Sequence, residues 1–193
     1  DNHSDWVLRT AWVAKGDRLL SGSRDRAVKL INVRNGQFID DINKLLEPIV
    51  SLTRHPKEEW CAYGGAEGGL RIYRAKENQE RTAGNNDVNL VREFERQPGP
   101  VHAVAFSPDG TLLAAAGANG AIRIYLTADG SRKTELLSHD GAVFALTFSP
   151  DGTSLYSGGF DGLVRVFDPA SGRLKAIFTP IQVDPSARQT AAK

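Results

Sequence analysis

The sequence predicts an all-β chain that is assembled from copies of one four-stranded module. The stretch VHAVAFSPDGTLLAAAGANGAIRIY at residues 101–125 returns as VFALTFSPDGTSLYSGGFDGLVRVF at residues 143–167, and weaker copies occupy residues 6–31 and 49–73. Within each copy, short runs rich in β-forming residues alternate with glycine-containing turns. A period near forty residues with several short strands per unit is typical of the blades of a β-propeller.

The first two units each contain four β-rich runs. The first unit combines alternating apolar residues with an Asn-Gly turn at Asn35–Gly36, which is a strong hairpin signal. Its expected strands cover residues 6–12, 18–23, 27–33 and 36–42. The second unit repeats this order with expected strands at residues 49–55, 60–65, 70–75 and 89–95.

The third and fourth units match each other most closely. Both begin with an alternating run that meets SPDG, in which proline and glycine favour a tight turn. Asn119–Gly120 and Asp161–Gly162 then form the turn between the second and third strands. The expected strands cover residues 101–107, 112–118, 121–127 and 133–138 in the third unit, and 143–149, 154–159, 163–168 and 173–179 in the fourth.

These units divide the chain into four predicted blades at residues 1–47, 48–98, 99–140 and 141–180. The second blade is longer, and its excess falls in a polar segment at residues 76–88 that we interpret as an inserted loop. The small, polar residues 181–193 are expected to form a tail or a linker to another domain. Because the chain starts inside a repeat, we also expect that an upstream segment has been removed or omitted.

Composition favours a soluble globular protein. Hydrophobic residues make up 40% of the chain, charged residues 24%, and the formal net charge is +1. This balance gives no support for binding nucleic acid or an anionic membrane, and no run is long enough to cross a membrane. The single cysteine, Cys61, excludes an internal disulfide. These features leave the compartment undecided between the cytoplasm and export.

The repeats resemble the WD repeat family, here with the SPDG turns of bacterial-type repeats. The residues that carry the resemblance are FSPDG, SGSRDRAVKLI and GFDGLVRVFD, and it extends over almost all of the repeated region. The resemblance implies a propeller in which His, Ser or Thr, Asp and Trp form a hydrogen-bonded tetrad inside a blade. It also implies that this chain supplies four four-stranded antiparallel blades, which are half or a fragment of a ring of seven or eight.

Offsets within the repeats place the tetrad in two blades. The turn position is occupied by Asp25, Glu67, Asn119 and Asp161, spaced 42, 52 and 42 residues apart. The residues that lie 22 and 4 positions before this turn residue are His3 and Ser21 in the first blade and His139 and Ser157 in the fourth. The corresponding residues of the second and third blades are Leu45, Tyr63, Gln97 and Ala115, which do not match. No blade has Trp in the fourth position, where Phe167 keeps the aromatic bulk.

A Ser-His-Asp set also occurs in nucleophilic enzymes. We favour the structural interpretation, because a catalytic triad has no reason to recur at blade spacing.

Two further expectations concern single positions. The basic residues Lys29, Arg71, Arg123 and Arg165 recur at one place in the third strand. We interpret them as long stems packed between blades with their charged ends in solvent. His55 lies in the turn RHPKEEW and is expected to be exposed.

Four blades leave apolar faces at both ends of the series. Such faces favour association. Three arrangements follow: a fragment of a larger propeller, two copies that pair into an eight-blade ring, or completion by other chains. We favour the homodimeric ring or the fragment over a separate four-blade propeller.

The mouth of the propeller is the expected partner-binding face. By the resemblance, partners dock where the turns between second and third strands gather, and aromatic and arginine side chains there would anchor them. The candidate partner-binding residues are Trp6, Leu8, Arg24, His102, Phe144 and Phe160. The alternative is that these rings only fill the channel or pack between blades.

The leading functional hypothesis is a non-catalytic scaffold that holds a protein or peptide at this mouth. The chain shows no metal motif, haem motif or phosphate loop, so we expect no metal and no cofactor. A lone Asp in each SPDG turn supplies too few ligands for calcium. A second hypothesis is the propeller region of a larger bacterial multidomain protein, exported and redox-associated, whose chemistry lies in other domains. A third is a propeller enzyme that uses His102 as a base.

Overall fold

The computed structural model describes residues 3–13, 16–77, 87–137 and 139–179, and it confirms the all-β class. Most of the predicted loop at residues 76–88 and the whole predicted tail at residues 181–193 lie outside these residues. The described residues contain sixteen strands and no helix, and therefore no helix that could cross a membrane.

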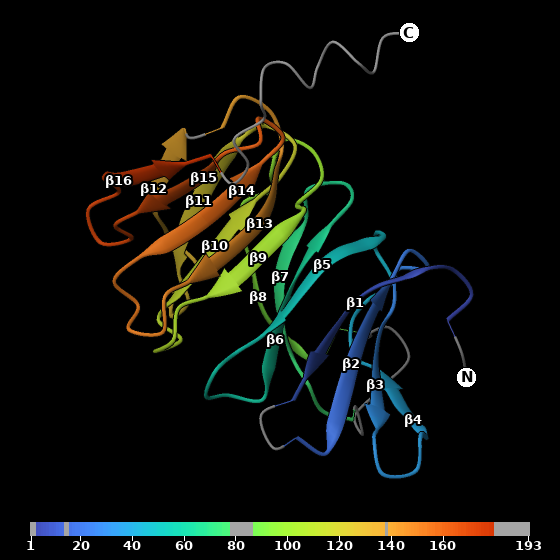
Figure 1. The fold of residues 1–193 in the computed structure, drawn as a ribbon. Helices are drawn as coiled ribbons and strands as arrows, with labels where there is room; N and C mark the ends of the chain where they lie inside the picture. Colours follow the sequence, from blue (N-terminus) through green and yellow to red (C-terminus); the bar gives the residue numbers. More distant parts are fainter. Residues whose placement is uncertain (1–2, 14–15, 78–86, 138, 180–193) are drawn as a thin grey trace, which may run out of the picture.

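The strands form four separate sheets, each with four antiparallel strands in chain order (Figure 1). Blade 1 contains β1 (Val7–Trp12), β2 (Arg18–Ser23), β3 (Val28–Asn32) and β4 (Phe38–Asp41). Blade 2 contains β5 (Ile49–Arg54), β6 (Trp60–Gly65), β7 (Leu70–Arg74) and β8 (Leu90–Glu93). Blade 3 contains β9 (Ala103–Phe106), β10 (Leu112–Ala116), β11 (Ala121–Leu126) and β12 (Arg132–Leu137). Blade 4 contains β13 (Val143–Phe148), β14 (Leu155–Gly159), β15 (Val164–Phe167) and β16 (Leu174–Phe178).

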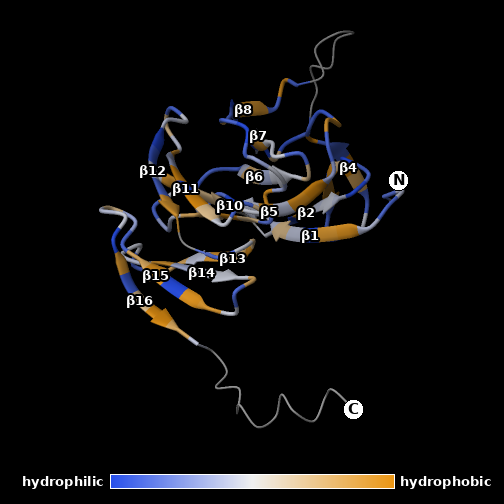
Figure 2. Ribbon diagram, turned by 90° about the horizontal axis from the view of Figure 1, so that it is seen from above, coloured by the Kyte–Doolittle hydropathy of each residue, from blue (hydrophilic) through white to orange (hydrophobic). Residues whose placement is uncertain are grey.

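The inner strands bring successive blades together. β5 packs against β1 and β9, and β9 packs against β13, so the sheets follow one another with blades 1 and 4 at the ends (Figure 2). The register repeats as well, because the inner-strand pairings of blades 1, 2 and 4 shift at equivalent places, after Val7, Ile49 and Val143. The equivalence of residues between blades therefore follows from the strand pairing.

The hydrophobic core is divided among the boundaries between blades. Leu20 and Leu30 of blade 1 pack with Tyr63 and Cys61 of blade 2, and all four are fully buried. Burial raises the pKa of the Cys61 thiol to about 12. Equivalent clusters join blade 2 to blade 3 and blade 3 to blade 4. Each inner blade is covered on both faces, as stacked blades require.

The two end blades each have one uncovered face. On blade 4, Phe178 pairs with Val164 as Leu136 pairs with Ile122 in blade 3, yet Phe178 is 53% exposed and Leu136 is 6% exposed. We call Tyr156, Val164 and Phe178 the leading face of blade 4.

The uncovered face of blade 1 is at the other end of the series. Val7 occupies the place of the buried Val143 and is 48% exposed, and Trp12 occupies the place of the buried Phe106. We call Val7, Trp12, Leu19 and Ile31 the trailing face of blade 1. Apolar segments of β1 and of β16 are visible at these ends in Figure 2.

His55 is buried, so the expectation that it is exposed was wrong. Its Nδ1 accepts hydrogen bonds from the N–H groups of Lys57 (3.2 Å) and Glu58 (2.9 Å), while Nε2–H donates to the carbonyl of Gly110 (3.2 Å). The ring also packs edge-on against Phe106 of blade 3. His55 therefore closes its own turn and ties blade 2 to the SPDG turn of blade 3, as a neutral imidazole.

We predict that acid weakens the fold through His55. Burial lowers the pKa of His55 below its ordinary value of 6.5, and protonation would remove the acceptor at Nδ1. The unfolded chain binds a proton at His55 more readily than the folded chain does, because the pKa is lowered only in the folded state. Well above pH 6.5 neither state is protonated at His55, so its contribution to the free energy of unfolding should be constant there. It should decrease as the pH falls through 6.5 toward the lowered pKa of the folded state. Urea unfolding measured across this range should show the decrease.

The matched control is His55→Asn, whose amide oxygen can accept the same bonds but cannot titrate. This variant should lose less stability than the original chain over the same pH range. Equal pH dependence in the two proteins would contradict the assignment.

Candidate partner-binding surface

The six candidate mouth residues lie at one end of the inner strands and in the adjoining turns. Trp6, Phe144 and Phe160 have exposed rings, and Phe160 is the most exposed of the three at 77%. Leu8 and His102 are half-buried. Large apolar side chains seldom remain in solvent without a reason when several gather on one face.

Trp6 and Arg24 form one contact group on blade 1. The Arg24 guanidinium lies 5.2 Å from the centroid of the Trp6 ring, and its Nε is 3.8 Å from Asp5 Oδ2. The backbone also links them, since Arg24 N donates to Trp6 O (3.0 Å). This cation–π contact holds an exposed aromatic ring beside a positive charge.

His102 and Phe144 form a second contact group where blades 3 and 4 meet. Their ring centroids are 5.2 Å apart, and both line a cavity of about 160 Å³ together with Arg9 of β1. Burial, and then the charge of Arg9, lowers the pKa of His102. His102 therefore offers this surface a neutral ring.

Phe160 is positioned by the turn that precedes β13. Its N–H donates to Ala142 O (2.7 Å), and Gly141 adopts a φ of 113°. A Cβ at Gly141 would lie 3.2 Å from the Phe160 Cβ, so only glycine suits both the backbone and the space. No contact is recorded between Phe160 and the ring pair of His102 and Phe144.

Blades 1 and 4 each hold a hydrogen-bonded His, Ser and Asp. His3 Nδ1–H donates to Asp25 (2.8 Å) and its Nε2 accepts from the Ser21 hydroxyl (2.7 Å). A carboxylate can only accept, which assigns the proton to Nδ1. His139 is 2.9 Å from Asp161 and 2.7 Å from Ser157 in the same arrangement.

The aspartates of these sets remain ionised. Burial alone would raise the pKa of Asp161, but the hydrogen bonds from His139 and Arg165 outweigh it and hold that pKa well below its ordinary value. Arg165 Nη1 is 2.6 Å from Asp161 Oδ2. Phe167 is buried in the apolar cluster between blades 3 and 4 and contributes packing there.

Blade 2 contains a buried network that the offsets missed. Glu47 is two residues from the expected position, Leu45, and is 2% exposed. Its Oε2 accepts from the N–H groups of Glu67 (2.8 Å) and Gly69 (3.2 Å), and its Oε1 accepts from Arg71 Nη1 (2.9 Å). One carboxylate thus performs the turn-closing role that Asp25 and Asp161 have in the other blades.

The role of Glu47 becomes visible only in three dimensions. A Cβ at Gly65 would overlap the Glu47 carboxylate, just as a Cβ at Gly159 would overlap the His139 ring. In blades 2 and 4 this glycine leaves the space that the buried side chain fills, whereas blade 1 has Ser23 at the equivalent position.

In blade 3 the equivalent network uses an amide. Gln97 Oε1 accepts from Arg123 Nη1 (2.6 Å), and Gln97 Nε2 donates to the hydroxyl of Tyr125 (2.5 Å). Gln97 stands at the expected offset, although its side chain differs from histidine. Tyr125 is fully buried beneath it.

The expectation that the recurring cations end in solvent was wrong in all four blades. Lys29, Arg71 and Arg123 are buried, and each forms an ion pair with the acid opposite it on the fourth strand. These partners are Asp41 (3.0 Å), Glu93 (2.6 Å) and Glu135 (2.8 Å). In blade 4 the residue opposite Arg165 is Ile177, and Arg165 turns to Asp161 instead.

We predict that Glu47→Ala destabilises the chain by about 3–5 kcal/mol, because it removes one of the two carboxylates that pair with the buried Arg71 and frees two backbone N–H groups. The matched control is Glu67→Ala, which removes an exposed carboxylate that pairs with Arg96 at 3.0 Å. That loss should cost about 0–1 kcal/mol. Urea unfolding of both variants measures the difference, and equal losses would show that the Glu47 network contributes no special stability.

Comparisons with known families agree with this architecture. The family model described as "WD domain, G-beta repeat" matches residues 1–32, 88–125 and 130–168, which together make up more than half of the chain. The unmatched stretch at residues 33–87 contains β4 to β7 and includes Glu47 and Tyr63, which replace the residues seen in blades 1 and 4.

Three curated relatives illustrate the similarity. Over 123 residues the chain is 27% identical to "Eukaryotic translation initiation factor 3 subunit I" of Caenorhabditis elegans, a match that spans 57% of this chain and 35% of the relative. The protein of the same name from Candida albicans is 26% identical over 113 residues, spanning 58% and 29%. "Serine-threonine kinase receptor-associated protein" of Homo sapiens is 30% identical over 94 residues, spanning 48% and 24%.

These matches span about a third or less of each relative's length. The three relatives come from eukaryotes, so they give no support to the bacterial source expected from the SPDG turns.

Proposed function

This chain belongs to the WD repeat family, and on that premise we propose that it is a non-catalytic module that docks a protein or peptide on the mouth face. The observation that carries the proposal is the gathering of exposed aromatic rings there. Trp6 packs against Arg24, Phe144 packs against the neutral ring of His102, and Phe160 is exposed in the turn between β14 and β15. Aromatic and arginine side chains supply most of the binding free energy in protein interfaces.

The burial of both serines supports a role without catalysis. Ser21 is 4% exposed and Ser157 is 2% exposed, and each hydroxyl already donates to a histidine. A nucleophile must reach its substrate, so these Ser-His-Asp sets fit structural roles inside their blades. His102 has no partner of the kind that would activate it as a base within the described residues: the contacts recorded for it are with Phe144 and Arg9.

The names of the relatives support a protein partner. One relative is named a subunit of an initiation factor and another is named a receptor-associated protein. We extend from them only the expectation that this chain also associates with another protein.

We predict that Phe144→Ala, Phe160→Ala and Arg24→Ala each weaken binding of a mouth-directed peptide by at least about tenfold, since each removes an anchor of the face. Peptides are first selected on the unmodified chain from a random-peptide phage library, and their affinities are then measured by fluorescence anisotropy.

Leu137→Ala serves as the control, because Leu137 is an exposed apolar residue on the outer strand β12. It should bind the same peptides as the unmodified chain does. Circular dichroism confirms that each variant is folded. Selected peptides that bind all three mouth variants with unchanged affinity would refute this docking face.

A second proposal concerns the two uncovered faces. The leading face of blade 4 and the trailing face of blade 1 occupy the same register positions that pack together at each internal boundary. A second copy of the chain, related by a two-fold axis, would cover both faces at once and close an eight-blade ring. The exposure of Phe178 and Val7 supports this arrangement.

We predict that the chain sediments as a dimer at micromolar concentration and that Phe178→Asp converts it to a monomer, because a carboxylate would be buried in the joined face. Leu137→Asp adds the same charge away from both end faces and should remain dimeric. Sedimentation equilibrium gives the masses. A monomeric unmodified chain would exclude the pairing.

A further inference from the structure

The inner strands of the four blades follow one another along one surface of the chain. β5 packs against β1 and β9, and β9 packs against β13 (Figure 1). We call the surface that these four strands form the inner wall. None of the four strands contains an aspartate or a glutamate, whereas β1 contains Arg9 and β5 contains Arg54. The charged side chains of these strands are therefore all positive.

Each of the two arginines lines a hollow in the inner wall. Arg9 lines the hollow of about 160 Å³ at the mouth, and Arg54 lines a second hollow of about 330 Å³. Val104 and Leu146 line both, so the two hollows adjoin. Every lining residue of both hollows belongs to the described part of the chain, and neither lining includes an acid. A ligand that lies along the two hollows thus meets two cations and no carboxylate.

Neither arginine is neutralised by an acid of the described residues. Arg9 and Arg54 are both exposed, and no ion pair is recorded for either within those residues. The hydrogen bond recorded for Arg9 runs from Nη1 to the neutral carbonyl of the preceding residue (2.7 Å). Asp109 lies in the SPDG turn next to the second hollow, but its carboxylate already accepts hydrogen bonds from Ser107 and Thr111. Both guanidinium groups therefore keep the capacity to bind a carboxylate.

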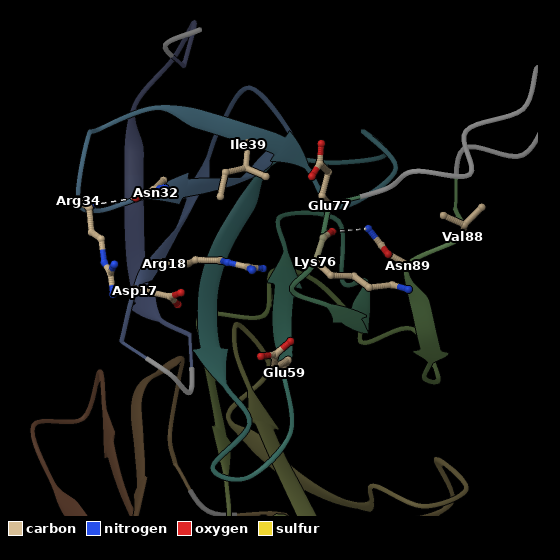
Figure 3. Close-up of a pocket in the computed structure, with 10 residues that line it drawn as sticks. All are labelled: Asp17, Arg18, Asn32, Arg34, Ile39, Glu59, Lys76, Glu77, Val88 and Asn89. Carbon is tan, nitrogen blue, oxygen red and sulfur yellow. Dashed lines mark hydrogen bonds between the residues drawn. The ribbon is translucent and has the colours of Figure 1, made fainter.

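The hollow between blades 1 and 2 lacks this uniform charge. It has a volume of about 640 Å³, and its lining combines Asp17 and Glu77 with Arg18 and Arg34 (Figure 3). A hollow with charges of both signs favours neither an anion nor a cation by its net charge. The inner wall favours an anion, because its charges have one sign.

The inner wall between the two arginines is apolar and has the length of a short extended segment. Val104 and Leu146 separate the two cations. In the strand register, Ser51 of β5 is equivalent to Arg9 of β1, and Arg54 is three residues farther along β5. At about 3.3 Å per residue, the two arginines are offset by roughly 10 Å along the strands. Three residues of an extended peptide span the same length.

We propose that the inner wall binds an extended protein segment in which two acidic residues flank apolar residues, with one carboxylate at Arg9 and the other at Arg54. The inference rests on the proposed function at its mouth end, where Arg9 shares a hollow with Phe144. Each planar guanidinium suits a carboxylate, and apolar side chains between the acids would cover Val104 and Leu146.

Two other arrangements bear on this choice of partner. A nucleic acid suits the inner wall less, because two cations separated by apolar surface neutralise few phosphates. Closure of the ring by a second copy would add the same two arginines and no acid from the equivalent strands, so the preference for an anion would remain.

The test uses a fluorescein-labelled hexapeptide with glutamate at its second and fifth positions and leucine or valine elsewhere. The comparison peptides carry glutamine or lysine at the same two positions, and a labelled hexathymidylate represents nucleic acid. Fluorescence anisotropy at low salt should show that the unmodified chain binds the glutamate peptide at least about tenfold more tightly than each of the others. Equal affinity for the glutamine peptide would overturn the proposal, since apolar contact alone would then account for binding. Equal affinity for the hexathymidylate would overturn it in favour of a general polyanion site.

Substitution then locates the binding. Arg54→Gln should weaken binding of the glutamate peptide at least about tenfold, whereas Arg173→Gln removes the same charge from an exposed turn of blade 4 and should leave binding unchanged. Circular dichroism confirms that both variants are folded. Binding by Arg54→Gln within about twofold of the unmodified chain would contradict the assignment to the inner wall. Arg54 is not among the mouth residues, so Arg54→Gln tests the inner wall and Phe160→Ala tests the docking face, and failure of one proposal is distinguishable from failure of the other.

Discussion

The sheets of this chain carry apolar side chains on both faces, and every stable feature depends on one sheet covering the next. Leu20 and Leu30 are buried only because blade 2 lies over them, and Leu136 is buried only because blade 4 does. The same requirement explains why Phe178 and Val7 are exposed, since each occupies a covered position at an end where no further sheet is described. Stability and association thus arise from the same surface, as in other repeat architectures whose units cannot bury their faces alone.

Polar groups inside the blades follow a rule of charge balance that tolerates different residues. Lys29, Arg71 and Arg123 each find an acid on the neighbouring strand, while Arg165 uses the aspartate of its own turn because Ile177 stands where the acid would be. Likewise, Asp25 closes the turn of blade 1 from within the turn, whereas Glu47 reaches the equivalent turn of blade 2 from the preceding connection. Different residues thus satisfy the same kind of buried network in different blades.

The repeat period and the glycine turns were enough to predict the all-β class and the approximate position of every strand. Strands and tight turns depend mainly on residues that are close in sequence, and the repeats confirm each assignment in the next copy. The buried polar networks were harder. Glu47 lies two residues off the expected offset, and only the space beside Gly65 reveals it, which is a three-dimensional property. His55 resembled an exposed turn residue because its partner, Gly110, belongs to another blade.

The buried Cys61 gives this chain a built-in reporter of internal motion. It is the single thiol in the sequence, lies in the cluster between blades 1 and 2, and stays protonated at neutral pH. An alkylating reagent can reach it only while those two sheets part, since reaction needs both access and the thiolate. The rate of labelling under native conditions therefore measures how often that seam opens, without any engineered probe. Ligands that bridge blades 1 and 2 would slow the reaction, whereas those held elsewhere would not.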